Sequence, residues 1–116
     1  MPQFLAHPEA REEFRADVRF YDEVRPGYGQ KFHDAIEAAL VGIKQFPLWW
    51  PVRRGEIRSC PVRGFPYRIL YAADEQGIYV VAFAHGSRHP DYWLKRLADL
   101  KRERSEKSDG TTDGKN

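Results

Sequence analysis

The sequence contains a single cysteine, Cys60, and no long hydrophobic segment. One cysteine cannot form an internal disulfide, so a reducing compartment is the default expectation. The apolar stretches fall far short of the roughly 20 residues that a membrane-spanning helix needs. The first seven residues lack the charged and long apolar parts of a secretory signal. We therefore expect a cytoplasmic protein that has no contact with a membrane.

Ligand sets for metals and nucleotides are also missing from the sequence. His85 and His89 are four residues apart, but Pro90 places them before a helix, and no acidic residue or cysteine follows at a matching spacing. Gly27 and Gly29 flank a helix break and do not follow a strand, unlike the glycines of a nucleotide-binding loop. We therefore expect neither a bound metal ion nor another cofactor.

The length and composition suit one small domain. With 116 residues, 41% hydrophobic and 14% aromatic, the chain can build one core but not two. Residues 1–40 hold eight acidic against five basic residues, whereas residues 53–68 hold five arginines against one acid. The five arginines are Arg53, Arg54, Arg58, Arg63 and Arg68. They indicate a face for an anionic partner, either nucleic acid or an acidic protein segment, unless they only keep an exposed hairpin soluble.

The first half of the chain has the pattern of a short strand followed by two helices. Residues 2–6 are short and apolar, and Pro8 followed by acidic residues is typical of a helix start. Apolar residues then recur with helical spacing up to a Pro-Gly break at residues 25–29, and again from Phe32 to Ile43. Two amphipathic helices joined in this way predict a helical hairpin that ends near Pro47.

The second half has the pattern of strands and a final helix. Residues 56–62, 67–72 and 78–84 read as strands separated by turns, and a basic helix is expected from Pro90 to about Arg104. The order β-α-α-β-β-β-α predicts an α+β domain over residues 1–104, with a small antiparallel sheet of about four strands packed by the helical hairpin. Residues 105–116 contain no apolar residue and are expected to form a disordered polar tail.

The turn after the last strand gathers groups that can bind phosphate or transfer protons. Cleavage of RNA by its own 2′-hydroxyl needs a base, an acid and a cation at the scissile phosphate. His85 or His89 could serve as base or acid, Tyr92 as acid or orienting group, and Arg68 with Arg88 as charge stabilisers. In the alternative, Tyr92 caps the sheet together with Trp93, His85 bonds to nearby backbone, and the arginines bind an acidic partner.

Several motifs, taken in order, resemble the RelE/ParE superfamily of bacterial type II toxin–antitoxin toxins over roughly residues 4–97. They are Tyr21, Gly29 and Phe32 in the helical hairpin, the segments 43–47 (IKQFP), 65–71 (FPYRILY) and 85–93 (HGSRHPDYW), and Arg96. The resemblance implies a fold in which a helical hairpin packs on an antiparallel sheet. This agrees with the element order that the periodicity predicts.

The resemblance implies two different targets. Arg68 and Arg88 match the two arginine positions of the ribosome-dependent mRNA endonucleases, but Tyr92 lies closer to Arg88 than in that pattern. The lysine-rich second strand of that branch is represented only by Arg58 and Arg63. The Phe-Pro-Tyr segment and the ending of the last turn look more like the ParE, or plasmid-stabilisation, branch. We expect a toxin that inhibits DNA gyrase; the alternatives are an mRNA endonuclease and a degenerate module that binds its antitoxin without toxicity.

The resemblance also implies a protein partner. An antitoxin would wrap an acidic C-terminal segment around this chain, and the basic stretch would complement it electrostatically. The residues expected to contact the target or the antitoxin are Arg53, Arg54, Arg58, Arg63, His89, Trp93 and Arg96.

Overall fold

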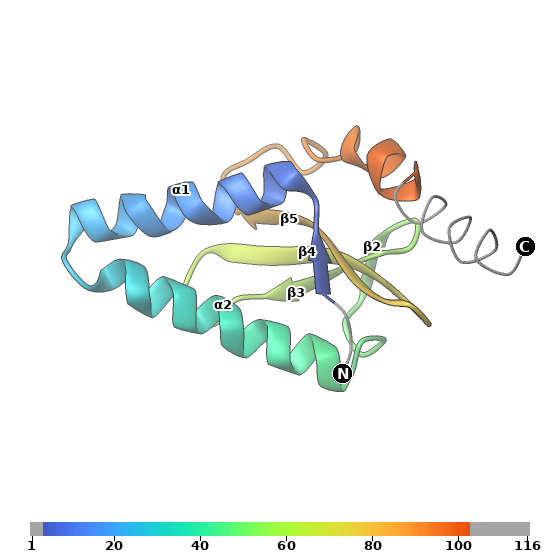
Figure 1. Ribbon diagram of the computed structural model, residues 1–116, viewed down its shortest axis with the longest axis horizontal. Coiled ribbons are helices and arrows are strands. Elements are labelled where there is room, and N and C mark those ends of the chain that lie inside the picture. Colours follow the sequence, from blue (N-terminus) through green and yellow to red (C-terminus); the bar gives the residue numbers. More distant parts are fainter. Residues whose placement is uncertain (1–3, 103–116) are drawn as a thin grey trace, which may run out of the picture.

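The computed structural model describes residues 4–102, which form a five-stranded sheet with helices packed against it (Figure 1). The strands are β1 (Phe4–Ala6), β2 (Val52–Arg54), β3 (Ile57–Pro61), β4 (Tyr67–Asp74) and β5 (Gly77–His85), and the helices are α1 (Pro8–Val24) and α2 (Tyr28–Gln45). The strand order is β1-β5-β4-β3-β2. A last helical segment covers residues 96–102. The expected α+β class with an N-terminal helical hairpin is confirmed.

The helical hairpin begins and turns at the residues that signal it in the sequence. Pro8 occupies the first helical turn of α1, where its missing N–H costs nothing, and the Nδ1 atom of His7 accepts a hydrogen bond from the Glu9 amide at 3.1 Å. Gly27 lies between the helices with a φ of 87°, a left-handed conformation that favours glycine. This single residue lets α2 run back antiparallel to α1 (Figure 1).

The sheet is mixed, because β1 pairs in parallel with β5 while the other neighbours are antiparallel. It has five strands, where the sequence predicts about four. The additional strand is β2, which lies between the predicted end of the helical hairpin near Pro47 and the strand predicted at residues 56–62; residues 46–51 form the connector before it. Its three residues are all exposed, so they lack the alternation of apolar and polar residues by which a strand is recognised.

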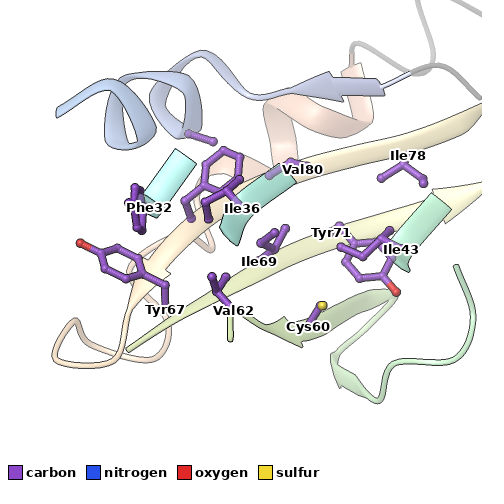
Figure 2. Packing of buried hydrophobic residues seen from close by; sticks show 12 residues of the cluster. Phe32, Ile36, Ile43, Cys60, Val62, Tyr67, Ile69, Tyr71, Ile78 and Val80 are labelled. Atoms are coloured by element: carbon purple, nitrogen blue, oxygen red, sulfur yellow. The ribbon is translucent and has the colours of Figure 1, made fainter. Parts of the chain in front are cut away.

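The main core lies between the helical hairpin and one face of the sheet. Figure 2 shows Phe32, Ile36 and Ile43 of α2 against the side chains that β3, β4 and β5 present to them. These three residues are at most 1% exposed, as expected for the apolar stripe of an amphipathic helix. Burial of each such side chain contributes about 1.5–3 kcal/mol. This face is therefore the main source of stability for the hairpin.

The opposite face of the sheet is covered by the segment that follows β5. Leu70 and Ala72 alternate with Ile69 and Tyr71 along β4, and they pack with Trp93 and Leu100 in a second cluster. Because both faces are covered, β4 and β5 are almost continuously buried. This explains why their sequences are apolar runs that do not alternate.

The C-terminal segment differs from the expected helix in its first turns. Between residues 90 and 95 the backbone forms successive turns, with hydrogen bonds from Tyr92 to His89 and from Leu94 to Asp91, and regular helix begins at residue 96. Pro90 therefore opens a run of tight turns and not the helix itself. These turns bring Trp93 down onto the sheet, where its side chain is completely buried.

Two expectations concern the chain as a whole. A single domain over residues 1–104 stays a prediction, and the polar tail at 105–116 lies outside the residues that the structure describes. Within residues 4–102, no helix is long and apolar enough to cross a membrane.

The close approach of α1 and α2 generates a prediction at Gly29. A Cβ atom there would lie 2.5 Å from the Val18 carbonyl oxygen and 2.8 Å from Asp22 Oδ1, which accepts a hydrogen bond from the Gly29 amide. We expect Gly29→Ala to lower the free energy of unfolding by about 1–3 kcal/mol, because the helices must move apart. The matched control is Gly42→Ala, whose Cβ would meet nothing within 4 Å. Gly42→Ala should raise the free energy of unfolding by about 0.5–1 kcal/mol. Urea denaturation measures both variants. Equal effects of the two variants would contradict the prediction.

Candidate functional site

A basic cleft of about 410 Å³ lies where β4 begins and β5 ends. Its polar lining comes mainly from three arginines and two histidines, namely Arg53, Arg68, Arg88, His85 and His89. None of the described residues that line it is acidic. The structure thus brings together the two arginines and the imidazoles that the sequence singled out. Such a cleft attracts anionic groups.

The alternation of side chains between the two faces of β4 places Arg68 at the cleft. It is exposed between the buried residues Tyr67 and Ile69, and it pairs with Pro61 on β3 and Ala84 on β5. Its Nη1 atom donates a hydrogen bond to Ser59 Oγ at 2.9 Å, from the neighbouring strand. This contact fixes one end of the guanidinium and leaves other N–H donors for a ligand.

His85 stabilises the turn that follows β5. Its Nδ1 atom accepts a hydrogen bond from the Ser87 amide at 2.9 Å and lies 2.7 Å from Ser87 Oγ. The imidazole packs edge-on against the Tyr67 ring, with 4.9 Å between the ring centroids. Because Nδ1 is engaged in the turn, a ligand would meet the ring through Nε2.

Tyr92 lines the cleft with its ring, but its hydroxyl is bonded elsewhere. The hydroxyl donates to Glu13 Oε2 at 2.7 Å, while the Arg88 guanidinium carbon lies 3.8 Å from the ring centroid. Burial, followed by the hydrogen bond to Glu13, raises the pKa of Tyr92 above its usual value. The Tyr92 hydroxyl is therefore directed at Glu13 and keeps its proton, which argues against the predicted role as a catalytic acid.

Glu13 links α1 to β5 and to the C-terminal segment, and it is not among the candidate residues that the sequence indicates. Arg96 donates to both of its carboxylate oxygens, at 3.1 and 2.8 Å, and the Phe83 amide donates to Oε1 at 3.1 Å. Arg96 also donates to the carbonyl of Val81 at 3.0 Å. An acid in the second turn of a helix is common, and its partners lie 70 to 83 residues away. No local signal could therefore have identified it.

Two residues expected to contact a partner are buried. Trp93 is 0% and Arg96 4% exposed. The indole N–H of Trp93 donates to the Pro90 carbonyl at 2.8 Å, and Arg96 is bound to Glu13. Both side chains hold the C-terminal segment in place, so we do not include them in the proposed contact surface.

The remaining basic residues have different environments. Arg58 donates to the carbonyls of Leu48 and Trp50, so it fixes the connector before β2. Arg54 forms an exposed ion pair with Asp91 at 3.3 Å. Arg63 is exposed in the turn between β3 and β4 and does not line the cleft. Of the basic stretch, only Arg53 and Arg68 therefore face the cleft.

Comparison with known proteins identifies a family and several solved structures of similar fold. Residues 5–90 match the family model described as the ParE toxin of the type II toxin–antitoxin system, parDE. The YoeB–YefM complex from Staphylococcus aureus contains a chain with a TM-score of 0.52 and 14% identity, covering 73% of this chain and 97% of that one. No curated protein showed a significant match. At that identity, the likeness to the solved complex concerns the fold alone.

The burial of Arg96 generates a prediction at Glu13. Glu13→Gln preserves the shape of the side chain but removes the nearer of the two carboxylates that face the buried guanidinium of Arg96, at 2.8 Å compared with 3.8 Å for Glu9. We expect it to lower the free energy of unfolding by about 3–5 kcal/mol. The matched control is Glu12→Gln on the same helix, which removes an exposed ion pair with Arg15 and should cost at most about 0.5 kcal/mol. Urea denaturation followed by circular dichroism measures both, and similar stabilities of the two variants would contradict the assigned role of Glu13.

Proposed function

Because the chain belongs to the ParE toxin family of type II toxin–antitoxin systems, we propose that it inhibits growth by binding DNA gyrase and is neutralised by an antitoxin. The choice of gyrase over mRNA as the target rests on the contacts of Tyr92. Its hydroxyl is bonded to Glu13 and its ring to Arg88, so the cleft offers cations for binding but not this phenol as a proton donor. The geometry therefore supports a binding toxin better than a nuclease.

The basic cleft is the proposed contact surface for a protein partner. Arg53, Arg68 and Arg88 line it together with His89, and none of the described residues lining it is an acid that would neutralise them. An antitoxin segment with acidic side chains would be complementary in charge. The fold neighbour was solved as a YoeB–YefM complex, and we propose that this chain likewise forms a complex with its antitoxin.

A second candidate function is ribosome-dependent cleavage of mRNA. It is favoured by one observation, namely that Arg68, Arg88 and the imidazole of His85 line the same cleft. Two guanidinium groups can stabilise a phosphorane-like transition state, and His85 could exchange a proton through Nε2. Tyr92 has no part in such a mechanism, since its hydroxyl is bonded to Glu13.

The gyrase proposal predicts that the purified protein blocks negative supercoiling of a relaxed plasmid by gyrase, or traps a cleavage complex. Arg88→Ala should weaken this inhibition about tenfold or more, because a charge-assisted contact is lost. The matched control is Arg63→Ala, an exposed arginine outside the cleft, which should change inhibition less than twofold. Supercoiling that is unaffected by the wild-type protein would overturn the proposal.

The nuclease alternative is tested with the same variants. It predicts cuts at defined codon positions in mRNA translated in vitro, and their loss with Arg88→Ala but not with Arg63→Ala. Intact mRNA in the presence of active ribosomes would exclude it. Normal growth on induction without an antitoxin would favour the third alternative, a module that binds its antitoxin but is no longer toxic.

A further inference from the structure

Arg88 is an exposed side chain held in one place. Its guanidinium lies over the Tyr92 ring, 3.8 Å from guanidinium carbon to ring centroid. It lines the basic cleft and also a second hollow beside α1, whose walls include Glu13, Asp17 and Phe20. An exposed arginine normally loses rotamer entropy when a ligand fixes it. Stacking on a ring reduces that loss, because the guanidinium is already oriented.

Tyr92 is in turn fixed from the interior of the protein. Its hydroxyl donates to Glu13 Oε2 at 2.7 Å, and the guanidinium carbon of Arg96 lies 5.1 Å from its ring centroid. A phenol that donates to a carboxylate is polarised towards the phenolate, which increases the electron density of the ring. Glu13 therefore both orients the ring and strengthens its attraction for Arg88.

Glu13 cannot move freely, because it accepts four hydrogen bonds in the structure. Two come from Arg96, one from the Phe83 amide of β5 and one from Tyr92. The chain of contacts from the Phe83 amide through Glu13 and Tyr92 to Arg88 thus connects rigid β5 backbone with the exposed guanidinium. Arg68 does not belong to this chain, since Ser59 on β3 holds it.

We propose that Glu13 and Tyr92 are positioning residues that hold the Arg88 guanidinium ready for bidentate contact with a carboxylate group of an acidic protein partner. The inference rests on the proposed use of the basic cleft as the contact surface. It assigns Tyr92 to orienting a cation and not to proton transfer. It also predicts that the effect of Tyr92 on binding passes through Arg88 and not through Arg68.

A double-mutant cycle tests this coupling. The probes are fluorescein-labelled oligoglutamate and oligothymidylate of equal length, and their binding to the full chain is measured by fluorescence anisotropy. We expect Arg88→Ala to weaken binding about tenfold and Tyr92→Leu about three- to tenfold, in line with the energies of charge-assisted and cation–π contacts. In the Arg88→Ala background, Tyr92→Leu should cost less than twofold, whereas in the Arg68→Ala background its full effect should remain.

A second variant keeps the test valid if Tyr92→Leu does not fold. Tyr92→Phe preserves the buried ring and removes only the hydroxyl that donates to Glu13, so binding should weaken about two- to threefold, again only when Arg88 is present. Near-ultraviolet circular dichroism checks the fold of each variant. A loss of equal size with and without Arg88 would show a general structural role and overturn the proposal. Wild-type binding by both folded Tyr92 variants would overturn it as well.

The two probes and a parallel assay separate the remaining outcomes. Coupling seen with oligoglutamate supports a carboxylate ligand, as in an acidic antitoxin segment. Coupling seen with oligothymidylate alone would identify a phosphate ligand and overturn the proposed partner. Binding of neither probe by the wild-type protein would overturn the proposal. Inhibition of gyrase by the same preparation reports on the proposed function independently, so failure of one is distinguishable from failure of the other.

Discussion

The structure depends on how the free edge of β5 is covered beyond the short strand β1. β1 pairs with residues 78–80, and no other strand within residues 4–102 lies beside the following part of β5 on that edge. The register with β4 shifts from Tyr71–Val80 to Leu70–Ala82, which makes Val81 the extra residue of a bulge. Glu13 and Arg96 satisfy this edge, because they bind the Phe83 amide and the Val81 carbonyl. A buried ion pair contributes little net energy, but it fixes which segments lie together.

The contacts that Glu13 makes at the edge of β5 also determine where Arg88 lies on the surface. The same carboxylate that satisfies β5 receives the Tyr92 hydroxyl, and the Tyr92 ring carries Arg88 to the cleft. Once Arg96 is bound to Glu13, the turns before residue 96 place Trp93 in the second cluster, so both faces of the sheet are closed. The position of Arg88 is therefore a consequence of closing the core and needs no separate scaffold.

The sequence predicts those parts of this arrangement that have a local signal. The helical hairpin has a regular apolar stripe, and β4 and β5 are apolar runs between turns, so all four elements were predicted. β2 has three exposed residues without a pattern, and residues 90–95 carry the Pro90 signal of a helix start but form tight turns. The turn after β5 could be recognised by its composition. The contacts of Glu13 could not, because they join residues far apart along the chain and depend on the bulge at Val81.

A count of charges in the sequence does not distinguish one arginine from another. In the folded protein the arginines differ in the groups that they contact. Arg58 is bound to backbone carbonyls, and Arg96 to a carboxylate inside the protein, so their charges serve the structure. Arg68 is held by a hydroxyl, and Arg88 stacks on an aromatic ring beside the carboxylates of Glu13 and Asp17. An anionic partner gains most from cations that are already oriented but still carry an uncompensated charge. The basic character of this surface therefore comes from the few arginines that line the cleft, and not from the number of arginines in the chain.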